Sequence, residues 1–267
     1  MKRLVALVAV ATLAVSLAAV AAARTSSPPT MHPGQLVVGF GDPAVNFANG
    51  KIRGSKYLNP KGYEVDLAAA IAKDLGLKPA YIYTPWAKLF APGHKAFDIS
   101  FQEATITAQR KRTVDFTKSY FDANQGILLS KKAKTPHSLA DLRKLQTCAQ
   151  TDTTGLDYIN NQLKPSKKPL VYPTTTALYQ SAQLNRCQAV ILDVPLVSLE
   201  AKSKPGAFGP VAGQIVTHEQ YGAVLQKGSK LTKTIDSVMK QLTKNGTIGK
   251  LQKKWFNINF ASIPTLK

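Results

Sequence analysis

An arginine and an aspartate that lie far apart in the chain, Arg110 and Asp193, have the chemistry to hold the two ends of a small zwitterion. A guanidinium binds a carboxylate through two parallel hydrogen bonds, and a carboxylate opposite accepts hydrogens from an ammonium group. Threonine hydroxyls and the amides of a helix N-terminus can donate to the same carboxylate. The residues alone leave open a second interpretation, in which both charges belong to structural ion pairs.

Polar side chains follow three apolar segments that we predict to be strands. They are Gln102, Glu103, Thr105 and Arg110 after 97–101, Thr153 and Thr154 after 147–150, and Asp193 after 189–192. In α/β sheets, ligands bind beyond the carboxyl ends of the strands. We therefore predict that these side chains line one crevice.

The elements that must position these residues alternate between strands and helices. Apolar periodicity and stop signals predict strands at 36–40, 80–83, 97–101, 147–150, 170–172 and 189–193, and helices at 66–75, 138–145, 155–162, 174–184, 230–243 and 248–256. This alternation predicts an α/β fold with mostly parallel sheets and helices on their faces.

The N-terminus has the features of a secretory signal peptide. Met1, Lys2 and Arg3 precede an apolar run at 4–23 that ends in three alanines, which predicts cleavage after Ala23. The alternative is a membrane anchor. Cysteine is absent near the cut, so we expect no lipid attachment. Removal of residues 1–23 leaves 244 residues, a length that suits two compact lobes. The mature chain would begin with a Pro- and Ser-rich leader at 24–33.

The chain is strongly basic and has two cysteines. Its formal charge of +20 becomes +18 without Lys2 and Arg3. The lysines fall in separate clusters without an interleaved aromatic ladder, which favours solvated faces over a nucleic-acid surface; a polyanion-binding module is the rival that charge alone suggests. Cys148 and Cys187 meet an oxidising compartment, which favours a disulfide over two buried thiols.

Signals for catalysis, metals and cofactors are weak. The stretch 39–44 fits a Gly-x-Gly-x-x-Ala dinucleotide pattern, but Pro43 and the asparagines after it predict a loop where that motif needs a helix. The four histidines lack metal-ligand spacing, and no Gly-x-Ser-x-Gly elbow occurs in the sequence. We expect no catalytic residue, no metal site and no cofactor.

Ordered motifs along most of the chain give a family resemblance. They are LVVGFGD, GYEVDLAAAIAKDLGL, YTPW, FDI, TITAQRKRTVDFTKSYF, SLADLRKL, TCAQTDTTGLDY, RCQAVILD and KNGTIGKLQKKWF, between residues 36 and 256. In order and spacing the chain resembles the periplasmic solute-binding proteins of polar amino-acid ABC importers. The resemblance implies an exported, monomeric protein that is not an enzyme, captures an amino acid between two lobes and delivers it to a membrane permease, without binding nucleic acid.

The resemblance also implies a domain organisation and a disulfide. Lobe 1 would comprise 34–123 and 222–267, and lobe 2 would comprise 124–221, with crossings near 121–125 and 219–222. Some members of the family carry cysteines at the positions of Cys148 and Cys187, which implies a bridge within lobe 2.

Roles for individual residues follow from the same resemblance. Arg110 resembles the clamp for the ligand carboxylate, with assistance from Thr105, Thr153 and Thr154, and Asp193 resembles the acceptor for the ligand ammonium. Trp86 and Phe47 correspond to positions of apolar walls, for which ordinary core packing is the alternative.

The chain departs from the family pattern at several positions. Gly41 stands where the family has an acid, 44–47 replaces a Tyr-Pro-Pro-Phe run, and Glu103 and Asp152 stand where small residues are usual. Glu103 would bind a cationic group of the ligand or neutralise Arg110, so we expect a polar or cationic amino acid. The same fold also resembles exported cyclohexadienyl dehydratases, in which Glu103 would act as a general acid.

Overall fold

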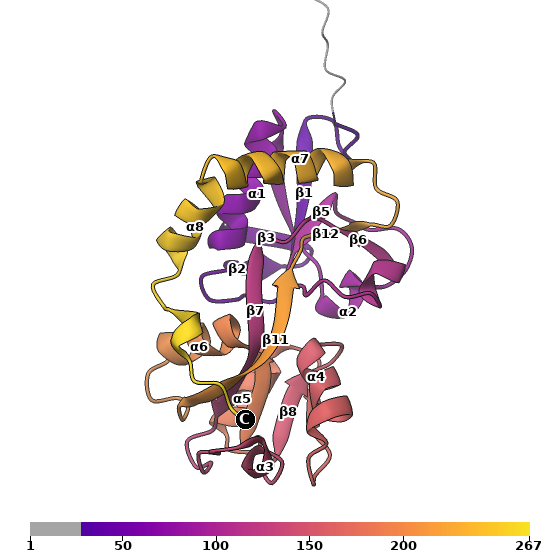
Figure 1. Ribbon diagram of the computed structural model, residues 1–267. Coiled ribbons are helices and arrows are strands. Elements are labelled where there is room, and N and C mark those ends of the chain that lie inside the picture. Colours follow the sequence, from indigo (N-terminus) through magenta and orange to yellow (C-terminus); the bar gives the residue numbers. More distant parts are fainter. Residues whose placement is uncertain (1–27) are drawn as a thin grey trace, which may run out of the picture.

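The computed structural model describes residues 28–267, so the predicted signal peptide lies outside the described residues. Within this range the chain forms two sheets with helices on their faces (Figure 1). The seven-stranded sheet has the order β2-β3-β4-β1-β5-β12-β6, and we call its half of the molecule lobe 1. The five-stranded sheet has the order β11-β7-β10-β8-β9 and belongs to lobe 2. The predicted two-lobed α/β fold is confirmed.

Lobe 1 contains most of the N-terminal half of the chain. Its strands are β1 (Gln35–Phe40), β2 (Asn49–Arg53), β3 (Lys56–Lys61), β4 (Lys78–Tyr83), β5 (Ile99–Phe101), β6 (Val114–Phe116) and β12 (Val224–Gln226). Its helices are α1 (Tyr63–Asp74), α2 (Trp86–Leu89), the 3-10 turn η1 (Arg110–Arg112), α7 (Leu231–Lys244) and α8 (Thr247–Trp255). Strand β1 lies between β4 and β5 and is parallel to both.

The central strand β1 shows how the sequence builds two cores in lobe 1. Leu36, Val38 and Phe40 point to the face covered by α1, α7 and α8, and all three are fully buried. Val37 points to the opposite face, where it packs with Leu89 of α2. A run of apolar residues on one strand therefore supplies both faces, as expected for a strand in the middle of an α/β sheet.

Lobe 2 repeats this arrangement on a smaller scale. Its strands are β7 (Phe121–Leu129), β8 (Thr147–Gln150), β9 (Leu170–Tyr172), β10 (Ala189–Asp193) and β11 (Val211–Tyr221). Its helices are α3 (Leu139–Leu142), α4 (Thr154–Tyr158) with the π-helical turn η2 (Ile159–Leu163), α5 (Thr175–Gln183) and α6 (Val194–Ser203). Ser138, Thr153 and Thr174 cap α3, α4 and α5 by accepting a backbone N–H through their hydroxyls.

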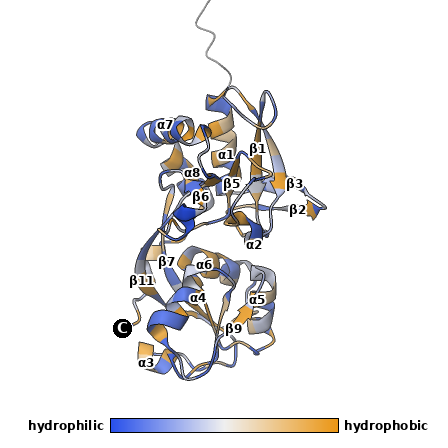
Figure 2. Cartoon of the chain, turned by 90° about the vertical axis from the view of Figure 1, so that its right-hand side faces the viewer, coloured by the Kyte–Doolittle hydropathy of each residue, from blue (hydrophilic) through white to orange (hydrophobic). Residues whose placement is uncertain are grey.

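Two long strands form the hinge. β7 and β11 pair in antiparallel fashion and run from lobe 1 into lobe 2, along one side of the molecule (Figures 1 and 2). Tyr221 is opposite Phe121 and Ile215 is opposite Gln125, with an irregularity between Ile215 and Glu219. These strands include both of the crossings that we expected.

The C-terminal segment differs from the expected lobe assignment. After α8 and the 3-10 turn η3 (Phe260–Ser262), the chain lies beside β11, with Gln214 N–H donating to Pro264 O and Leu266 N–H to Gln214 O, both at 2.8 Å. Leu266 is buried in the core of lobe 2. Assignment of all of 222–267 to lobe 1 is therefore wrong for the tail, and the chain end lies in lobe 2 (Figure 1).

The expected leader overlaps the start of the folded body. Met31 N–H donates to Asp98 Oδ1 at 2.8 Å, which ties the leader to lobe 1 before β1 begins. We keep the other lobe boundaries as a proposal. Lobe 1 would comprise 34–123 and the chain from 222 to the start of the C-terminal tail, and lobe 2 would comprise 124–221. In the described part of the chain, no helix has the length and apolar character that crossing a membrane requires.

The predicted disulfide is confirmed. Cys148 and Cys187 are bonded, their Cα atoms are 5.9 Å apart, and both side chains are fully buried. Cys148 lies on β8 opposite Val190 of β10, and Cys187 lies just before β10. The bond therefore joins two neighbouring strands whose ends contribute to the crevice.

Removal of this disulfide is expected to destabilise the protein without changing its fold. The cysteines are 39 residues apart, and a loop of that length corresponds to about 4 kcal/mol of lost chain entropy in the unfolded state. We predict that a variant with Cys148→Ala and Cys187→Ala unfolds at lower urea concentration than the oxidised wild type. Fully reduced wild type is the matched control and should unfold near the variant; an unchanged midpoint in both would contradict the prediction.

Candidate functional site

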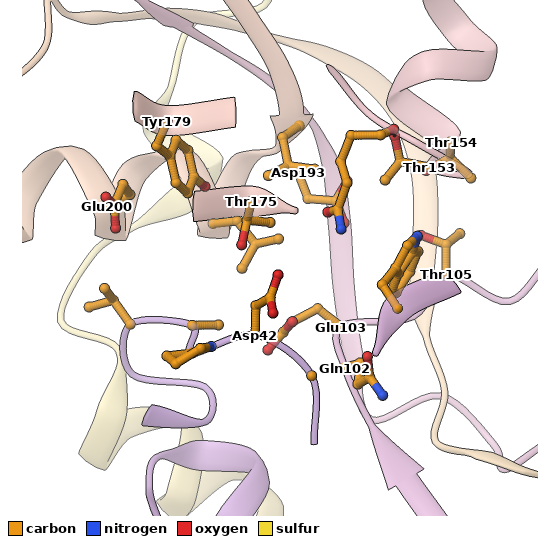
Figure 3. A pocket seen from close by; sticks show the side chains of 18 of the residues that line it. Asp42, Gln102, Glu103, Thr105, Thr153, Thr154, Thr175, Tyr179, Asp193 and Glu200 are labelled. Atoms are coloured by element: carbon orange, nitrogen blue, oxygen red, sulfur yellow. Dashed lines mark hydrogen bonds between the residues drawn. The ribbon is translucent and has the colours of Figure 1, made fainter. Parts of the chain in front are cut away.

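A cavity lies between the lobes (Figure 3). Lobe 1 contributes the loop 41–45 after β1, the start of α2, and the segment from the end of β5 to η1. Lobe 2 contributes the ends of β8 and β10 and the first turns of α4, α5 and α6. The lining residues are Gly41, Asp42, Pro43, Ala44, Val45, Trp86, Gln102, Glu103, Thr105, Arg110, Gln150, Thr153, Thr154, Thr175, Tyr179, Leu192, Asp193, Leu196 and Glu200.

The structure brings together all of the predicted ligand-contact residues except Phe47. Phe47 is fully buried in lobe 1, where its ring packs against Phe256 with centroids 4.8 Å apart and against Phe121 at 5.4 Å. A bridge between Ala44 and Ala48 turns this segment inward. The expectation that Phe47 forms a wall of the cavity is therefore wrong, and its alternative, core packing, holds.

Sequence reasoning missed an acid in the first loop. Asp42 lines the cavity, and its Oδ1 accepts a hydrogen bond from the Tyr83 hydroxyl at 3.0 Å. A Cβ on Gly41 would lie only 2.4 Å from Gln102 Oε1. The Gln102 side chain thus occupies the space of a side chain at position 41, and the acid is found one residue later.

Three further residues of the cavity lie on helices of lobe 2. Thr175 and Tyr179 are four residues apart on α5 and so share a helix face. Glu200 lies on α6, two turns after Asp193, the residue that directly precedes this helix. These helical spacings were a usable signal. Glu200 is almost fully buried, and its Oε1 accepts from Lys204 Nζ at 2.6 Å.

Arg110 connects the lobes through backbone carbonyls. Its Nη1 donates to Thr105 O at 2.8 Å in lobe 1, and its Nη2 donates to Asp152 O at 2.9 Å in lobe 2. The guanidinium also lies over the ring of Phe90, 4.2 Å from the centroid. Burial lowers the pKa of Arg110 to about 10, whereas the carboxylates of Asp193 and Glu219 act in the opposite direction.

Trp86 makes a second contact between the lobes. Its Nε1 donates to Thr151 O at 2.9 Å, directly before the carbonyl that Arg110 binds. Two donors of lobe 1 thus bind consecutive carbonyls of one turn in lobe 2. In this closed arrangement, hydrogen bonds join the two lobes on the Trp86 side of the cavity.

The hydroxyls of the site threonines are bonded within the protein. Thr105 Oγ1 donates to Glu219 Oε2 at 2.7 Å, and Thr154 Oγ1 donates to the same oxygen at 2.6 Å. Glu219 lies on the hinge strand β11, so its carboxylate joins both lobes to the hinge. Thr153 donates to Gln150 O at 2.7 Å while it caps α4.

Asp193 ends β10 with both oxygens directed to hydrogen-bond donors. Gln125 Nε2 donates to its Oδ1 and the Tyr221 hydroxyl to its Oδ2, each at 2.6 Å. Burial, together with the negative charge of Glu219, raises the pKa of Asp193 to about 7. The carboxylate therefore lacks a strong cationic partner, which an ammonium group in the cavity would supply.

Glu103 has an unusual backbone conformation at the floor of the cavity. Its φ is 48°, in the left-handed region that favours glycine, which explains why a small residue is usual there. Its backbone N–H donates to Glu64 Oε1 at 3.0 Å. Burial and the charge of Glu64 raise the pKa of Glu103 well above its ordinary value. Asp152, with φ of 59°, departs from the family pattern in the same way.

The cavity is rich in acceptors and poor in cations. Carboxyl groups of Asp42, Glu103, Asp193 and Glu200 line it, together with the guanidinium of Arg110. In Figure 3, Asp42 and Glu103 lie across the cavity from Thr175, Tyr179 and Glu200. Groups of three side chains with metal-ligand geometry are absent from residues 28–267. A positively charged organic solute is the complement of such a lining.

These features define a class of protein, the bilobed solute-binding proteins that hold a ligand between two α/β lobes. Residues 37–258 match the bacterial extracellular solute-binding proteins, family 3, and the chain belongs to that family. Among its relatives is the L-cystine-binding protein TcyJ of Escherichia coli strain K12, which is 25% identical over 198 residues, 73% of this chain and 74% of the relative.

Solved structures agree with this assignment. An ancestral arginine-binding protein bound to glutamine is 28% identical, with a TM-score of 0.76 over 85% of this chain and all of the other. The ancestral amino acid-binding protein AncCDT-1, a precursor of cyclohexadienyl dehydratase, is 31% identical, with a TM-score of 0.73 over 84% of this chain and 96% of the other. The family and these proteins bind solutes and are not enzymes.

The raised pKa of Asp193 predicts how stability depends on pH. Folded Asp193 keeps its proton up to about pH 7, whereas the unfolded carboxyl loses it near its ordinary value of 3.8. The folded state holds more protons within that window, so the stability of the ligand-free protein should fall as the pH rises from about 4 to about 7. Asp193→Asn should remove part of this decline, up to about 4 kcal/mol.

Thermal unfolding of wild type and Asp193→Asn, without ligand, at pH 4 and at pH 7.5 measures this effect. The variant should melt higher than wild type at pH 7.5, and the difference should shrink at pH 4. The Tyr221 hydroxyl can accept as well as donate, so the new amide keeps a partner. Identical pH dependence in the two proteins would contradict the raised pKa.

Proposed function

We propose that this protein captures an amino acid with a cationic side chain and delivers it to the permease of an ABC importer. The observation that carries the proposal is the lining of the cavity, in which four carboxyl groups from both lobes face one guanidinium. Glu200 is already paired with Lys204, and a zwitterionic head group at Asp193 would still leave Asp42 and Glu103 without a counter-charge. A ligand with a second positive charge satisfies more of them.

The head group of the ligand belongs at the end of the cavity that contains Asp193 and Arg110. Asp193 retains lone pairs beside its bonds to Gln125 and Tyr221 and accepts the α-ammonium. Two of the five guanidinium N–H groups of Arg110 are used by backbone carbonyls, and the others can approach a carboxylate. Trp86 and Leu192 add apolar surface.

The cationic side chain of the ligand belongs at the opposite end. Asp42 and Glu103 approach it from lobe 1, and Glu200 approaches it from lobe 2 (Figure 3). The Tyr179 ring provides a surface for the ligand's methylene groups and, as an aromatic face, attracts a cation. Pro43 and Leu196 complete this end with apolar atoms.

The relatives support an amino acid as the ligand. The names of the relative and of the two solved structures given above describe binding of cystine, of arginine and glutamine, and of an amino acid that is not specified. We further propose that the protein is exported as a monomer, with its signal peptide cleaved after Ala23, and acts in the periplasm without a cofactor. The dehydratase alternative has less support, because the similar protein in that lineage is a binding protein that precedes the enzyme.

Calorimetry with individual amino acids tests the proposal. L-arginine and L-lysine should bind at least tenfold more tightly than L-glutamine, and L-leucine should bind weakest of all. Tight binding of L-leucine with weak binding of the cationic amino acids would contradict the proposed ligand class.

The side-chain end is tested by Glu103→Gln. Loss of one charged hydrogen-bond partner should weaken L-arginine binding by about tenfold or more. L-glutamine, which has no charge at that end, should be affected much less. Asp74→Asn, at an exposed acid at the end of α1, is the matched control and should leave both affinities unchanged. Equal losses for arginine and glutamine in Glu103→Gln would count against a cation subsite.

A further inference from the structure

The hydroxyl groups of Thr105, Thr153 and Thr154, which would help to recognise a ligand carboxylate, already donate their hydrogens within the protein. We propose that the site therefore also binds diamines and guanidino-amines that lack an α-carboxylate, with affinities close to those of the corresponding amino acids. This inference rests on the proposed function, since it concerns the same cavity between the lobes. It widens the ligand class from cationic amino acids to their decarboxylated counterparts.

The threonine hydroxyls are the first step of the argument. A hydroxyl has a single hydrogen to donate. The hydrogens of Thr105 and Thr154 go to one oxygen of Glu219, at 2.7 and 2.6 Å, and the hydrogen of Thr153 goes to Gln150 O. A ligand carboxylate placed between the two lobes would find lone pairs on these threonines rather than donors.

Glu219 does not line the cavity, but it places a negative charge directly behind two threonines that do, Thr105 and Thr154. Its second oxygen accepts from Gln125 Nε2 at 2.9 Å, and the same amide donates to Asp193. The carboxylate of Glu219 is thus fixed by both lobes and by the second hinge strand. It takes the threonine hydrogens that a ligand carboxylate would otherwise use, and its charge would repel a carboxylate brought by the ligand.

Arg110 would bind a ligand carboxylate less strongly than a guanidinium without other hydrogen-bond partners would. Its two terminal nitrogens each bind a backbone carbonyl, one in each lobe, so part of the fork holds the lobes together. Its charge is already opposed by Asp193, Glu219, Asp157 and Asp152. The positive potential that remains for a ligand carboxylate is correspondingly weak.

The electrostatic balance of the cavity favours the decarboxylated ligand. Arginine or lysine brings two positive charges and one negative charge, whereas agmatine or cadaverine brings two positive charges alone. Both cations of such a diamine have acceptors, Asp193 at one end and Asp42, Glu103 and Glu200 at the other. Loss of the α-carboxylate thus removes a repulsion along with a contact, and the two contributions offset each other.

Pairs of ligands that differ only by a carboxylate test the proposal. Calorimetry on the wild-type protein should compare L-arginine with agmatine and L-lysine with cadaverine, in the same buffer and salt. Each amine is expected to bind within tenfold of its amino acid. If an amino acid binds and its amine binds more than tenfold weaker, the inference is overturned and the proposed function stands. If neither amino acid nor amine binds, both fail.

Glu219→Gln tests the assigned cause. Loss of the charge and of one accepting oxygen releases a threonine hydroxyl, so the affinity ratio of L-arginine to agmatine should rise by about tenfold. A merely structural role for Glu219 would change both affinities by the same factor and would overturn the assignment. Asp122→Asn is the matched control, because Asp122 is an exposed acid on the hinge strand β7 that bonds Gln220 outside the cavity. The ratio should be unchanged in that variant.

Discussion

One carboxylate joins both lobes of this protein to its hinge. Glu219 stands on a hinge strand and accepts hydrogens from Thr105 in lobe 1, from Thr154 in lobe 2 and from Gln125 on the other hinge strand. Because the two threonines bind the same oxygen, neither lobe can move away without the loss of a charge-assisted bond. The network continues through Gln125 to Asp193, so the contact that bridges the lobes also orients an acid that lines the cavity.

Buried carboxyl groups in and beside the cavity make the ligand-free site electrostatically unfavourable. Asp193 and Glu64 have pKa values raised to about 7, and the pKa of Glu103 is raised well above its ordinary value, with burial as the largest cause in each case. Such a cluster reduces the stability of the ligand-free protein, and the cationic ligand proposed above would restore it. On that proposal, ligand selectivity would arise from charges that the closed protein leaves unbalanced.

The sequence predicted the site well wherever a strand end fixed a residue. Asp193 and the segment 147–150 were placed correctly because short apolar runs define strand ends, and parallel strands bring such ends to one edge. Phe47 was misplaced because an aromatic residue in a loop can face either a ligand or the core. Its packing against Phe121 and Phe256, which are distant in the sequence, places it in the core, and the local sequence does not show that contact. Glu219 was taken as part of a crossing, since nothing local to it shows which side chains from two distant lobes will meet its carboxylate.

The C-terminal tail adds a constraint on how such a molecule can move. It leaves α8 in lobe 1, passes the hinge and ends beside β11, where Thr265 pairs with Gln214 and Leu266 enters the core of lobe 2. Three stretches of chain, rather than two, therefore link the lobes. Parallel tethers resist torsion while they permit bending, so opening should be a swing about an axis across the tethers, with little twist of one lobe relative to the other.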